Sequence, residues 1–345
     1  MKSMLALPCA LLLILTSIAS CRDDRGEGQR TSLPYHGQAA GKPALLESLE
    51  RRLRQFIDTL QRAGGHRTRV VFTDGNAWTE RYLLDAMSTP GVRAARQEFI
   101  VSRRSGGEGR IANIVTEVPG GSDSIVVIVA HFDATAARDH RRGATNGEAR
   151  APGANDNATG VAAMIELLRL ASSHRGQLRY SVLFVAVNAE ERHHDYRSGT
   201  RRDDAHHFGS RHAARLILRS GRPVKCAITL DMIGWHPRGD TIRLFAGPGA
   251  GVIARELVTA MDPSQGHPAL GGPITGCSNS DNESFDRVGI PSVLIMEACR
   301  PWRSEGSRPR NRWYHTQADT VEHVRITMVA ATVRWLWSWL RRAPT

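Results

Sequence analysis

Lysine is scarce in this basic chain. The 345 residues include 46 lysines and arginines against 34 acidic residues, which gives a formal net charge of +12. Only Lys2, Lys42 and Lys225 are lysines, and the other 43 basic residues are arginines. No basic helix and no RNA-binding signature accompanies this charge. We therefore interpret it as an arginine-rich solvated surface and expect no nucleic-acid partner.

The sequence also lacks an internal repeat, and its first apolar run does not have membrane-spanning length. That run lies within residues 1–20, after Lys2, and is too short and too early for a spanning helix. A basic start followed by such a run is typical of a secretion signal. Its end, Ile18 to Cys21, resembles the bacterial lipobox, in which cleavage leaves the cysteine as a lipidated N-terminus. The alternative is an ordinary signal peptide that happens to end in cysteine.

Residues 21–42 are polar, rich in Gly, Arg and Gln, and without hydrophobic periodicity, so they predict a flexible tether. Acyl chains on Cys21 would anchor the chain to a membrane, because each buried methylene contributes about 0.8 kcal/mol. We expect a lipid-anchored protein of the bacterial cell envelope, on the periplasmic or outer-membrane side and not in the cytoplasm.

Cysteine is also sparse. Cys9 would leave with the signal peptide, which leaves Cys226, Cys277 and Cys299 in an oxidising compartment besides the lipidated Cys21. Three thiols cannot all pair, and a bridge between Cys277 and Cys299 is one of the pairings open to them.

Helical and strand-like patterns alternate along residues 43–345, which we expect to form a single domain. The predicted helices are 43–63, 76–87, 161–170, 210–218, 252–261 and 320–342. The predicted strands are 97–101, 111–117, 125–130, 180–188, 226–233, 241–245 and 292–297. Alternation of this kind predicts a three-layer α/β fold, with a mixed, mainly parallel central sheet and helices on both faces.

The last predicted helix is rich in tryptophan, with Trp335, Trp337 and Trp339 beside leucines. Aromatic residues at this density indicate core packing. The alternative is contact with a membrane surface, because Arg334 and Arg341 flank the aromatic stretch in a chain that we expect to be tethered.

A histidine and several carboxylates follow the strand-like run at residues 125–130. The run leads into His131 and Asp133, and the motif GANDNATG follows at residues 153–160 with Asp156 in its centre. In an open α/β sheet, ligands bind at the carboxyl ends of the strands. Imidazole nitrogen and carboxylate oxygen at that edge suit zinc, which takes such donors at about 2 Å.

Further acids and a histidine occur at the ends of other apolar runs. Glu190 and Glu191 follow the strand predicted at 180–188, Asp231 follows the apolar run before it, and His315 lies in the motif RWYHTQAD near the C-terminus. The sequence therefore supplies enough ligands of the right type for a metal site at one sheet edge.

The order of these motifs, HFD, GANDNATG, AEE, LDMIG and YHTQAD, resembles that of zinc aminopeptidases of the aminopeptidase Y and bacterial leucyl aminopeptidase type. Their clan also contains glutamate carboxypeptidases and glutaminyl cyclases. The resemblance runs from about residue 75 to the C-terminal helix. It implies the zinc-exopeptidase fold, which is phosphorylase/hydrolase-like, in residues 43–345.

The same resemblance implies a site with two zinc ions. Asp156 would bridge the ions, one of which would add His131 and Asp231 and the other Glu191 and His315. Three carboxylates against two divalent ions leave one net positive charge, which a bridging hydroxide would neutralise. The donor types also suit cobalt or manganese.

The resemblance also implies roles for three further residues. Glu190 would be the general base that takes a proton from the metal-bridging water and passes it to the leaving amine. Asp133 would accept the second N–H of the His131 imidazole and fix its tautomer, unless it is only a turn residue. Tyr314 would polarise the scissile carbonyl, or it would simply pack as an aromatic residue.

The function implied is hydrolysis of N-terminal amino acids from peptides or proteins by a two-zinc aminopeptidase. One alternative is a carboxypeptidase, for which arginines would clamp the substrate carboxylate. Another is a glutaminyl-cyclase-like acyltransferase, an enzyme type that shares the fold but acts with one zinc. The last is a non-catalytic binding protein of the envelope.

Two stretches, residues 137–152 and 192–208, are longer than the family pattern requires, and we expect both to rim the mouth of the active site. The second contains four histidines, which we interpret as side chains of a solvated loop, with additional metal binding as the alternative. These are His193, His194, His206 and His207.

Two further aspartates are close to family motifs. Asp281 lies in SDNESF, where relatives often have a histidine after the aspartate and this chain has Asn282, so we assign it no role. Asp319, together with Thr320, is predicted to cap the last helix rather than to serve catalysis.

Overall fold

The computed structural model describes residues 42–103, 105–140, 150–193, 206–237, 239–272, 274–306 and 308–341, all within one compact unit. The predicted signal peptide, the lipidation site at Cys21 and nearly all of the predicted tether lie outside these residues. Within the described part of the chain, no helix combines the length and the apolar character needed to cross a membrane.

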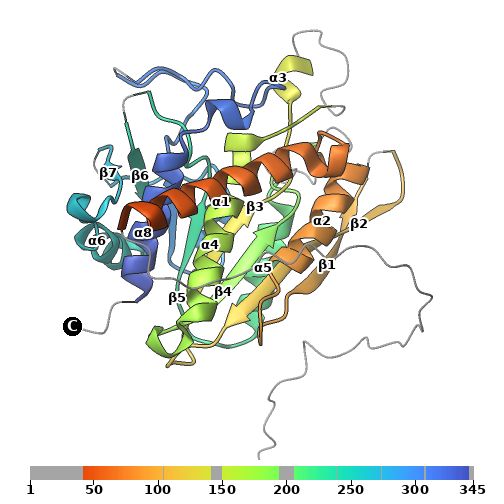
Figure 1. The fold of residues 1–345 in the computed structure, drawn as a ribbon. Coiled ribbons are helices and arrows are strands. Elements are labelled where there is room, and N and C mark those ends of the chain that lie inside the picture. Colours follow the sequence, from red (N-terminus) through yellow and green to blue (C-terminus); the bar gives the residue numbers. More distant parts are fainter. Residues whose placement is uncertain are drawn as a thin grey trace, which may run out of the picture. The chain divides into compact units, whose positions relative to one another are not determined.

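A mixed sheet of eight strands forms the centre of the unit (Figure 1). The strands are β1 Ala95–Ser102, β2 Glu108–Val118, β3 Ile125–His131, β4 Ser181–Val187, β5 Val224–Leu230, β6 Thr241–Ala246, β7 Ala269–Leu270 and β8 Ser292–Met296. Their order is β1-β2-β4-β3-β5-β8-β6-β7. Strands β4, β3, β5 and β8 are parallel, whereas β2 pairs antiparallel with β1 and β4, and β6 with β8. The predicted mixed, mainly parallel sheet is confirmed.

Helices cover both faces of this sheet (Figure 1). The helices are α1 Lys42–Arg62, α2 Asp74–Ala86, α3 Ala137–His140, α4 Thr159–Ser173, α5 Phe208–Arg219, α6 Gly251–Thr259, α7 Asn282–Asp286 and α8 Ile326–Leu340. One hydrophobic cluster joins α1, α4 and α8 to Val126 and Ile128 of β3, and another joins α5 and α7 to Val127 and Val129. Successive residues of a strand point to opposite faces, so β3 is covered on both sides and all seven of its residues are buried.

The last helix begins later than predicted. It starts at Ile326 rather than at residue 320, and a short 3-10 turn, Val321–His323, precedes it. The backbone N–H of Arg325 donates to the carbonyl of Gly234 at 2.7 Å, which ties the segment before the helix to the loop after β5. The backbone of Arg325 is extended rather than helical (φ −82°, ψ 93°), so the helix begins after this residue.

The three tryptophans of α8 lie in the core, as predicted. Trp335 is fully buried and its Nε1–H donates to the carbonyl of Leu257 at 2.7 Å, while Trp337 and Trp339 are 9% and 8% exposed. Side chains this deeply packed leave no aromatic surface for a membrane on this helix.

One disulfide bond joins Cys277 to Cys299. Cys226 is a buried free thiol in β5. Burial raises the pKa of this thiol to about 12, so it stays protonated and unreactive.

Candidate functional site

Two groups of metal-ligating side chains share one residue, Asp156. His131, Asp156 and Asp231 form the first group, and Asp156, Glu191 and His315 form the second, with the donor atoms of each group within 4.8 Å of one another. Asp156 Oδ1 lies 3.3 Å from His131 Nε2, and its Oδ2 lies 3.2 Å from His315 Nε2. Each oxygen of this carboxylate therefore faces a different group.

The donor atoms are spaced as ligands around cations would be. His131 Nε2 lies 3.5 Å from Asp231 Oδ1, and His315 Nε2 lies 3.1 Å from Glu191 Oε1. Glu191 Oε1 and Asp231 Oδ1 are buried, and within the described residues the imidazoles that face them make no well-aligned hydrogen bond to either oxygen. Buried polar atoms are normally satisfied, so these oxygens indicate a missing partner. With three donors in each group, the residues fit two zinc ions.

The electrostatics of the site also favour cations. Burial lowers the pKa of His315, but Glu191 and Asp156 outweigh it and raise that pKa to about 10. His131 behaves alike: burial opposes its protonation, yet Glu190 and the adjacent aspartates raise its pKa well above the usual value. Burial raises the pKa of Glu191 to about 8. The crowded carboxylates thus hold protons on two imidazoles, and divalent ions would supply positive charge in place of those protons, with the imidazoles neutral.

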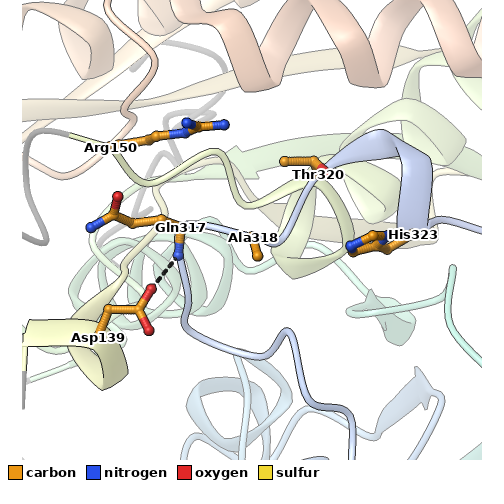
Figure 2. Close-up of a pocket in the computed structure, with 6 residues that line it drawn as sticks. All are labelled: Asp139, Arg150, Gln317, Ala318, Thr320 and His323. Carbon is orange, nitrogen blue, oxygen red and sulfur yellow. Dashed lines mark hydrogen bonds between the residues drawn. The ribbon is translucent and has the colours of Figure 1, made fainter. Parts of the chain in front are cut away.

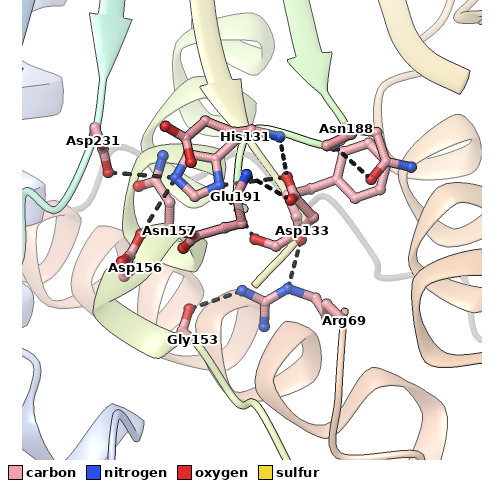
Figure 3. Close-up of polar contacts among 12 residues, drawn as sticks. Arg69, His131, Asp133, Gly153, Asp156, Asn157, Asn188, Glu191 and Asp231 are labelled. Atoms are coloured by element: carbon pink, nitrogen blue, oxygen red, sulfur yellow. Dashed lines mark hydrogen bonds and ion pairs between the residues drawn. The ribbon is translucent and has the colours of Figure 1, made fainter. Parts of the chain in front are cut away.

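These side chains converge because the strands that carry them end at one sheet edge (Figure 3). His131 is the last residue of β3, and the glutamates and Asp231 follow β4 and β5. The backbone is left-handed at Ala189 (φ 57°), Met232 (φ 46°) and His315 (φ 57°). Positive φ is uncommon outside glycine, and here it occurs at His315 and directly beside Asp231 and Glu190. These turns aim the side chains into a common space.

The motif GANDNATG is fastened to the end of β5. Asn157 Nδ2 donates to the carbonyl of Leu230 at 2.8 Å, and its Oδ1 accepts from the N–H of Met232 at 3.2 Å. A Cβ on Gly160 would lie 2.4 Å from the carbonyl oxygen of Leu230, so only glycine permits this close approach. The peptide bond between Asp156 and Asn157 is cis. The spacing between the two ligand-bearing loops is therefore set by the polar and small residues of the motif itself.

A buried arginine, Arg69, supports the loop from behind. Its guanidinium donates to the carbonyls of Phe132 and Gly153 at 2.8 Å each, and also to Leu60 and Pro152 (Figure 3). Burial lowers the pKa of Arg69 to about 10, so it stays charged. The single guanidinium group of Arg69 thus binds four backbone carbonyls from three segments of the chain. Nothing in the sequence distinguishes this arginine from the other 42.

Asp133 holds the two glutamates in place. Its carboxylate accepts the N–H of Glu190 at 3.1 Å and the N–H of Glu191 at 3.0 Å. We predicted that it would bind the second nitrogen of His131, but that Nδ1 lies 3.6 Å from the carboxylate and 3.2 Å from the Asp133 carbonyl oxygen. The carboxylate is drawn to two backbone donors instead.

His207 contacts Glu190, the predicted general base. The sequence did not reveal this contact. Its Nε2 lies 2.9 Å from Glu190 Oε1, and the side chain is only 3% exposed. The interpretation of this histidine as part of a solvated loop is therefore wrong. Burial opposes ionisation of Glu190, but His131 and His207 outweigh it and lower its pKa to about 2, so the carboxylate is charged. His194 and the residues to 205 lie outside the described part of the chain.

Asp319 does not cap the last helix. Its carboxylate accepts the N–H of Asn155 at 2.9 Å and the N–H of Asp156 at 3.0 Å. Thr320 makes no capping hydrogen bond through its side chain. The acid is drawn to two adjacent amides of GANDNATG, which lack partners in their own turn. Asp319 thus positions the backbone of the shared ligand.

Two other buried acids lie near the site. Glu297 accepts from Asn155 Nδ2 and Asn311 Nδ2 at 2.9 Å each, which joins the motif to the loop after β8. Asp281 is fully buried, and burial raises its pKa to about 7. Asp281 does not line the cavity described below.

A cavity of about 630 Å³ opens over the ligands. Its apolar wall consists of Met232, Met296, Trp302 and Tyr314, and the Tyr314 ring stacks on the His315 ring at 3.6 Å between centroids. Burial raises the pKa of Tyr314 well above its usual value, so its hydroxyl keeps its proton. The disulfide fastens the loops that carry Trp302 and, on the polar side, Ser278 and Asn279.

Both long stretches contribute to this cavity at their described ends, with Ala137 and Arg138 from the first and Arg192, His206 and His207 from the second. Residues 141–149 and 194–205 lie outside the described part.

The first stretch also holds the segment that carries His315. The N–H of Arg138 donates to the His315 carbonyl at 3.1 Å, and Asp139 Oδ2 accepts the N–H of Gln317 at 2.7 Å (Figure 2). A second cavity, of about 500 Å³, lies here beside Gln317, Ala318 and Arg150. Neither of the two metal-ligating groups that share Asp156 lies in it.

Comparison with known proteins agrees with the motif order. A profile of peptidase family M28 matches residues 113–340, more than half of the chain. The chain belongs to peptidase family M28. The predicted relationship to zinc exopeptidases is therefore confirmed.

The related sequences differ in how much of their own length matches this chain. The chain is 25% identical to the Escherichia coli protein YfbL, described as uncharacterized, over 83% of this chain and 85% of that protein. It is 26% identical to a probable leucine aminopeptidase of Trichophyton verrucosum over 61% of this chain and 52% of that protein. The chain thus spans about half the length of that aminopeptidase.

Solved structures share the M28 fold with this chain. A leucine aminopeptidase precursor from Bacteroides thetaiotaomicron has a TM-score of 0.70 at 18% identity, covering 86% of this chain and 97% of its own. A glutaminyl cyclase from the same species has a TM-score of 0.68 at 18% identity, covering 86% and 98%. A Zn-dependent exopeptidase from Parabacteroides distasonis has a TM-score of 0.66 at 20% identity, covering 85% and 98%. The fold therefore agrees with either activity.

We predict that Asp319→Ala weakens metal binding and stability together. It would leave two buried amides unpaired, at about 1–3 kcal/mol each, and free the backbone of Asp156, which should lower metal affinity roughly 10- to 100-fold. Urea unfolding and metal analysis after dialysis measure the two effects. Asp319→Asn keeps one acceptor oxygen, so its stability and its metal affinity should lie between those of Asp319→Ala and those of the parent protein. Unchanged metal affinity in the alanine variant would contradict the positioning role.

Proposed function

We propose that this chain is a two-zinc aminopeptidase that hydrolyses N-terminal amino acids from peptides or proteins. The observation that supports it most is the placement of Asp156, whose two oxygens face separate ligand groups 3.3 Å and 3.2 Å away. A one-zinc enzyme of the glutaminyl cyclase type does not need a shared carboxylate with a full second group. The retention of every ligand also argues against a non-catalytic binding protein.

His131 and Asp231 would hold one zinc ion, and Glu191 and His315 the other, with Asp156 between them. Bound zinc would lower the pKa of water, orient the peptide carbonyl and stabilise negative charge on its oxygen. Tyr314 keeps its phenolic proton beside this position and is available as a hydrogen-bond donor to the carbonyl.

Glu190 would move the proton in this reaction. It lies at the cavity, is ionised and does not belong to either ligand group, because the consecutive side chains of Glu190 and Glu191 point in different directions. It would take a proton from the attacking water and deliver it to the leaving amine. The backbone contacts of Asp133 fix where this carboxylate sits.

The acidic character of the cavity suits a substrate with a free amine. Glu190 and Glu283 line it outside the two zinc-ligand groups, and an ammonium group would be attracted to them. Arg138 and Arg192 also line it, and they are the residues on which a carboxypeptidase would have to rely.

Peptides that begin with Leu, Arg or Gln would distinguish the activities when products are weighed by mass spectrometry. We expect loss of the first residue from free peptides and from C-terminally amidated ones, but no reaction of N-acetylated ones. Shortening from the C-terminus, blocked by amidation, would instead identify a carboxypeptidase. Loss of ammonia from the Gln peptide alone would identify a cyclase, and no product at all would contradict an enzymatic function.

Glu190→Gln should lower kcat by roughly 10²- to 10⁴-fold, because the amide cannot accept the proton. Metal content at stoichiometric zinc should not change, since Glu190 is outside both ligand groups. Glu98→Gln, at an exposed position of β1, is the matched control and should retain full activity. Full activity of Glu190→Gln would remove this residue from the mechanism.

We also propose that residues 1–20 direct the chain to the bacterial envelope and that a lipid on Cys21 anchors it there, with residues 21–42 as tether. The lipobox-like sequence supports this. Cys21→Ala should move the protein from the membrane pellet to the soluble fraction, as followed by immunoblotting. A parent protein already soluble after fractionation would rule out the anchor.

A further inference from the structure

A third group of metal-ligating side chains lies beside the two that share Asp156. It consists of Glu190, His206 and His207, whose donor atoms are all within 4.8 Å of one another. All three residues line the active-site cavity of about 630 Å³. Two imidazoles and one carboxylate are a common ligand set for zinc, with the fourth position left to water.

The distances within this group match those between ligands of a single ion. His207 Nε2 and Glu190 Oε1 are 2.9 Å apart. Two donors at about 2 Å from a tetrahedral zinc ion would be separated by about 3.3 Å. A small outward movement of either side chain would therefore admit the ion in place of the hydrogen bond. The rings of His206 and His207 lie edge to face at 3.7 Å between centroids.

Neighbouring residues support the histidines from behind. Glu283 Oε2 lies 3.5 Å from His207 Nδ1, and Arg287 holds that carboxylate through a hydrogen bond from its Nε at 2.9 Å. A carboxylate behind a histidine is the usual support of a metal-binding imidazole. Arg211 donates to the backbone carbonyl of His206.

We propose that Glu190, His206 and His207 form a third cation site, which zinc fills only when it is in excess, and that the ion there inhibits the enzyme. Occupancy needs excess metal because the hydrogen bond between Glu190 and His207 must be given up near two other cations. The ion inhibits because it occupies the carboxylate that accepts the proton. The inhibition rests on the proposed function, but the existence of the site does not.

Both histidines belong to residues 192–208, a stretch longer than the family pattern requires. These two histidines thus lie outside the motifs that carry the family resemblance, whereas the residues of the shared Asp156 site lie within them. Inhibition by excess zinc would limit peptide hydrolysis to conditions in which the metal is scarce.

Metal counting tests the site directly. The chelator-stripped protein is dialysed against a series of free Zn²⁺ concentrations, and bound zinc per chain is measured by atomic emission. We expect two ions at low zinc and three in excess for the parent, but only two in excess for His206→Asn. His66→Asn changes an exposed histidine outside the site and should still reach three. Glu190→Gln removes a second ligand of the same group and should also stop at two.

Activity gives an independent reading. In His206→Asn, the zinc concentration for half-inhibition should rise roughly 10-fold or more, since even loss of an outer partner of a ligand weakens metal binding that much. His66→Asn should be inhibited like the parent. Each assay is compared with the same protein at low zinc, so a changed basal rate does not affect the reading.

A parent protein that never binds more than two ions would overturn the proposal. So would a third ion that persists in both His206→Asn and Glu190→Gln, because it would lie elsewhere. A third ion lost from both variants, in a protein that releases no amino acid from any peptide, would establish the site and contradict only the proposed function.

Discussion

The burial of several carboxylates against one another is the constraint on which the rest of this structure depends. Asp156, Glu190, Glu191 and Asp231 are each less than a tenth exposed and converge at one edge of the sheet. Buried like charges are costly unless cations compensate them. His131 and His315 supply that compensation with protons, and the same geometry would accept divalent ions. Contacts from the surrounding fold hold these acids in place against their electrostatic repulsion.

Two kinds of support hold them. Asp133 uses both carboxylate oxygens to bind the consecutive amides of Glu190 and Glu191, and Asp319 binds those of Asn155 and Asp156 in the same way. Arg69 binds the carbonyl of Phe132, next to Asp133, and that of Gly153, at the start of GANDNATG. A backbone fixed from two sides limits how far the ligands can move apart, which keeps Asp156 shared between the two groups.

The candidate base, Glu190, connects the peptidase site to the third group of ligands. It adjoins Glu191 in sequence, yet its side chain turns toward His207 instead of toward the shared carboxylate. A hydrolytic site needs this carboxylate free to accept a proton, and a metal-binding histidine pair competes for it. The Glu190 carboxylate would therefore take part both in catalysis and in its inhibition by metal.

The sequence by itself predicted the layers of the fold, and its resemblance to zinc aminopeptidases implied the five candidate ligands that the structure brings together. Strand-like runs that end in His131, Glu191 or Asp231 are local patterns, and the carboxyl ends of parallel strands must meet at one edge. Only the tertiary structure decided the roles of Arg69, Asp319 and His207. Asp319 is 163 residues from Asp156 along the chain, and Arg69 is one arginine among 43. Their contacts depend on how distant loops pack, and neither periodicity nor spacing along the chain records that packing.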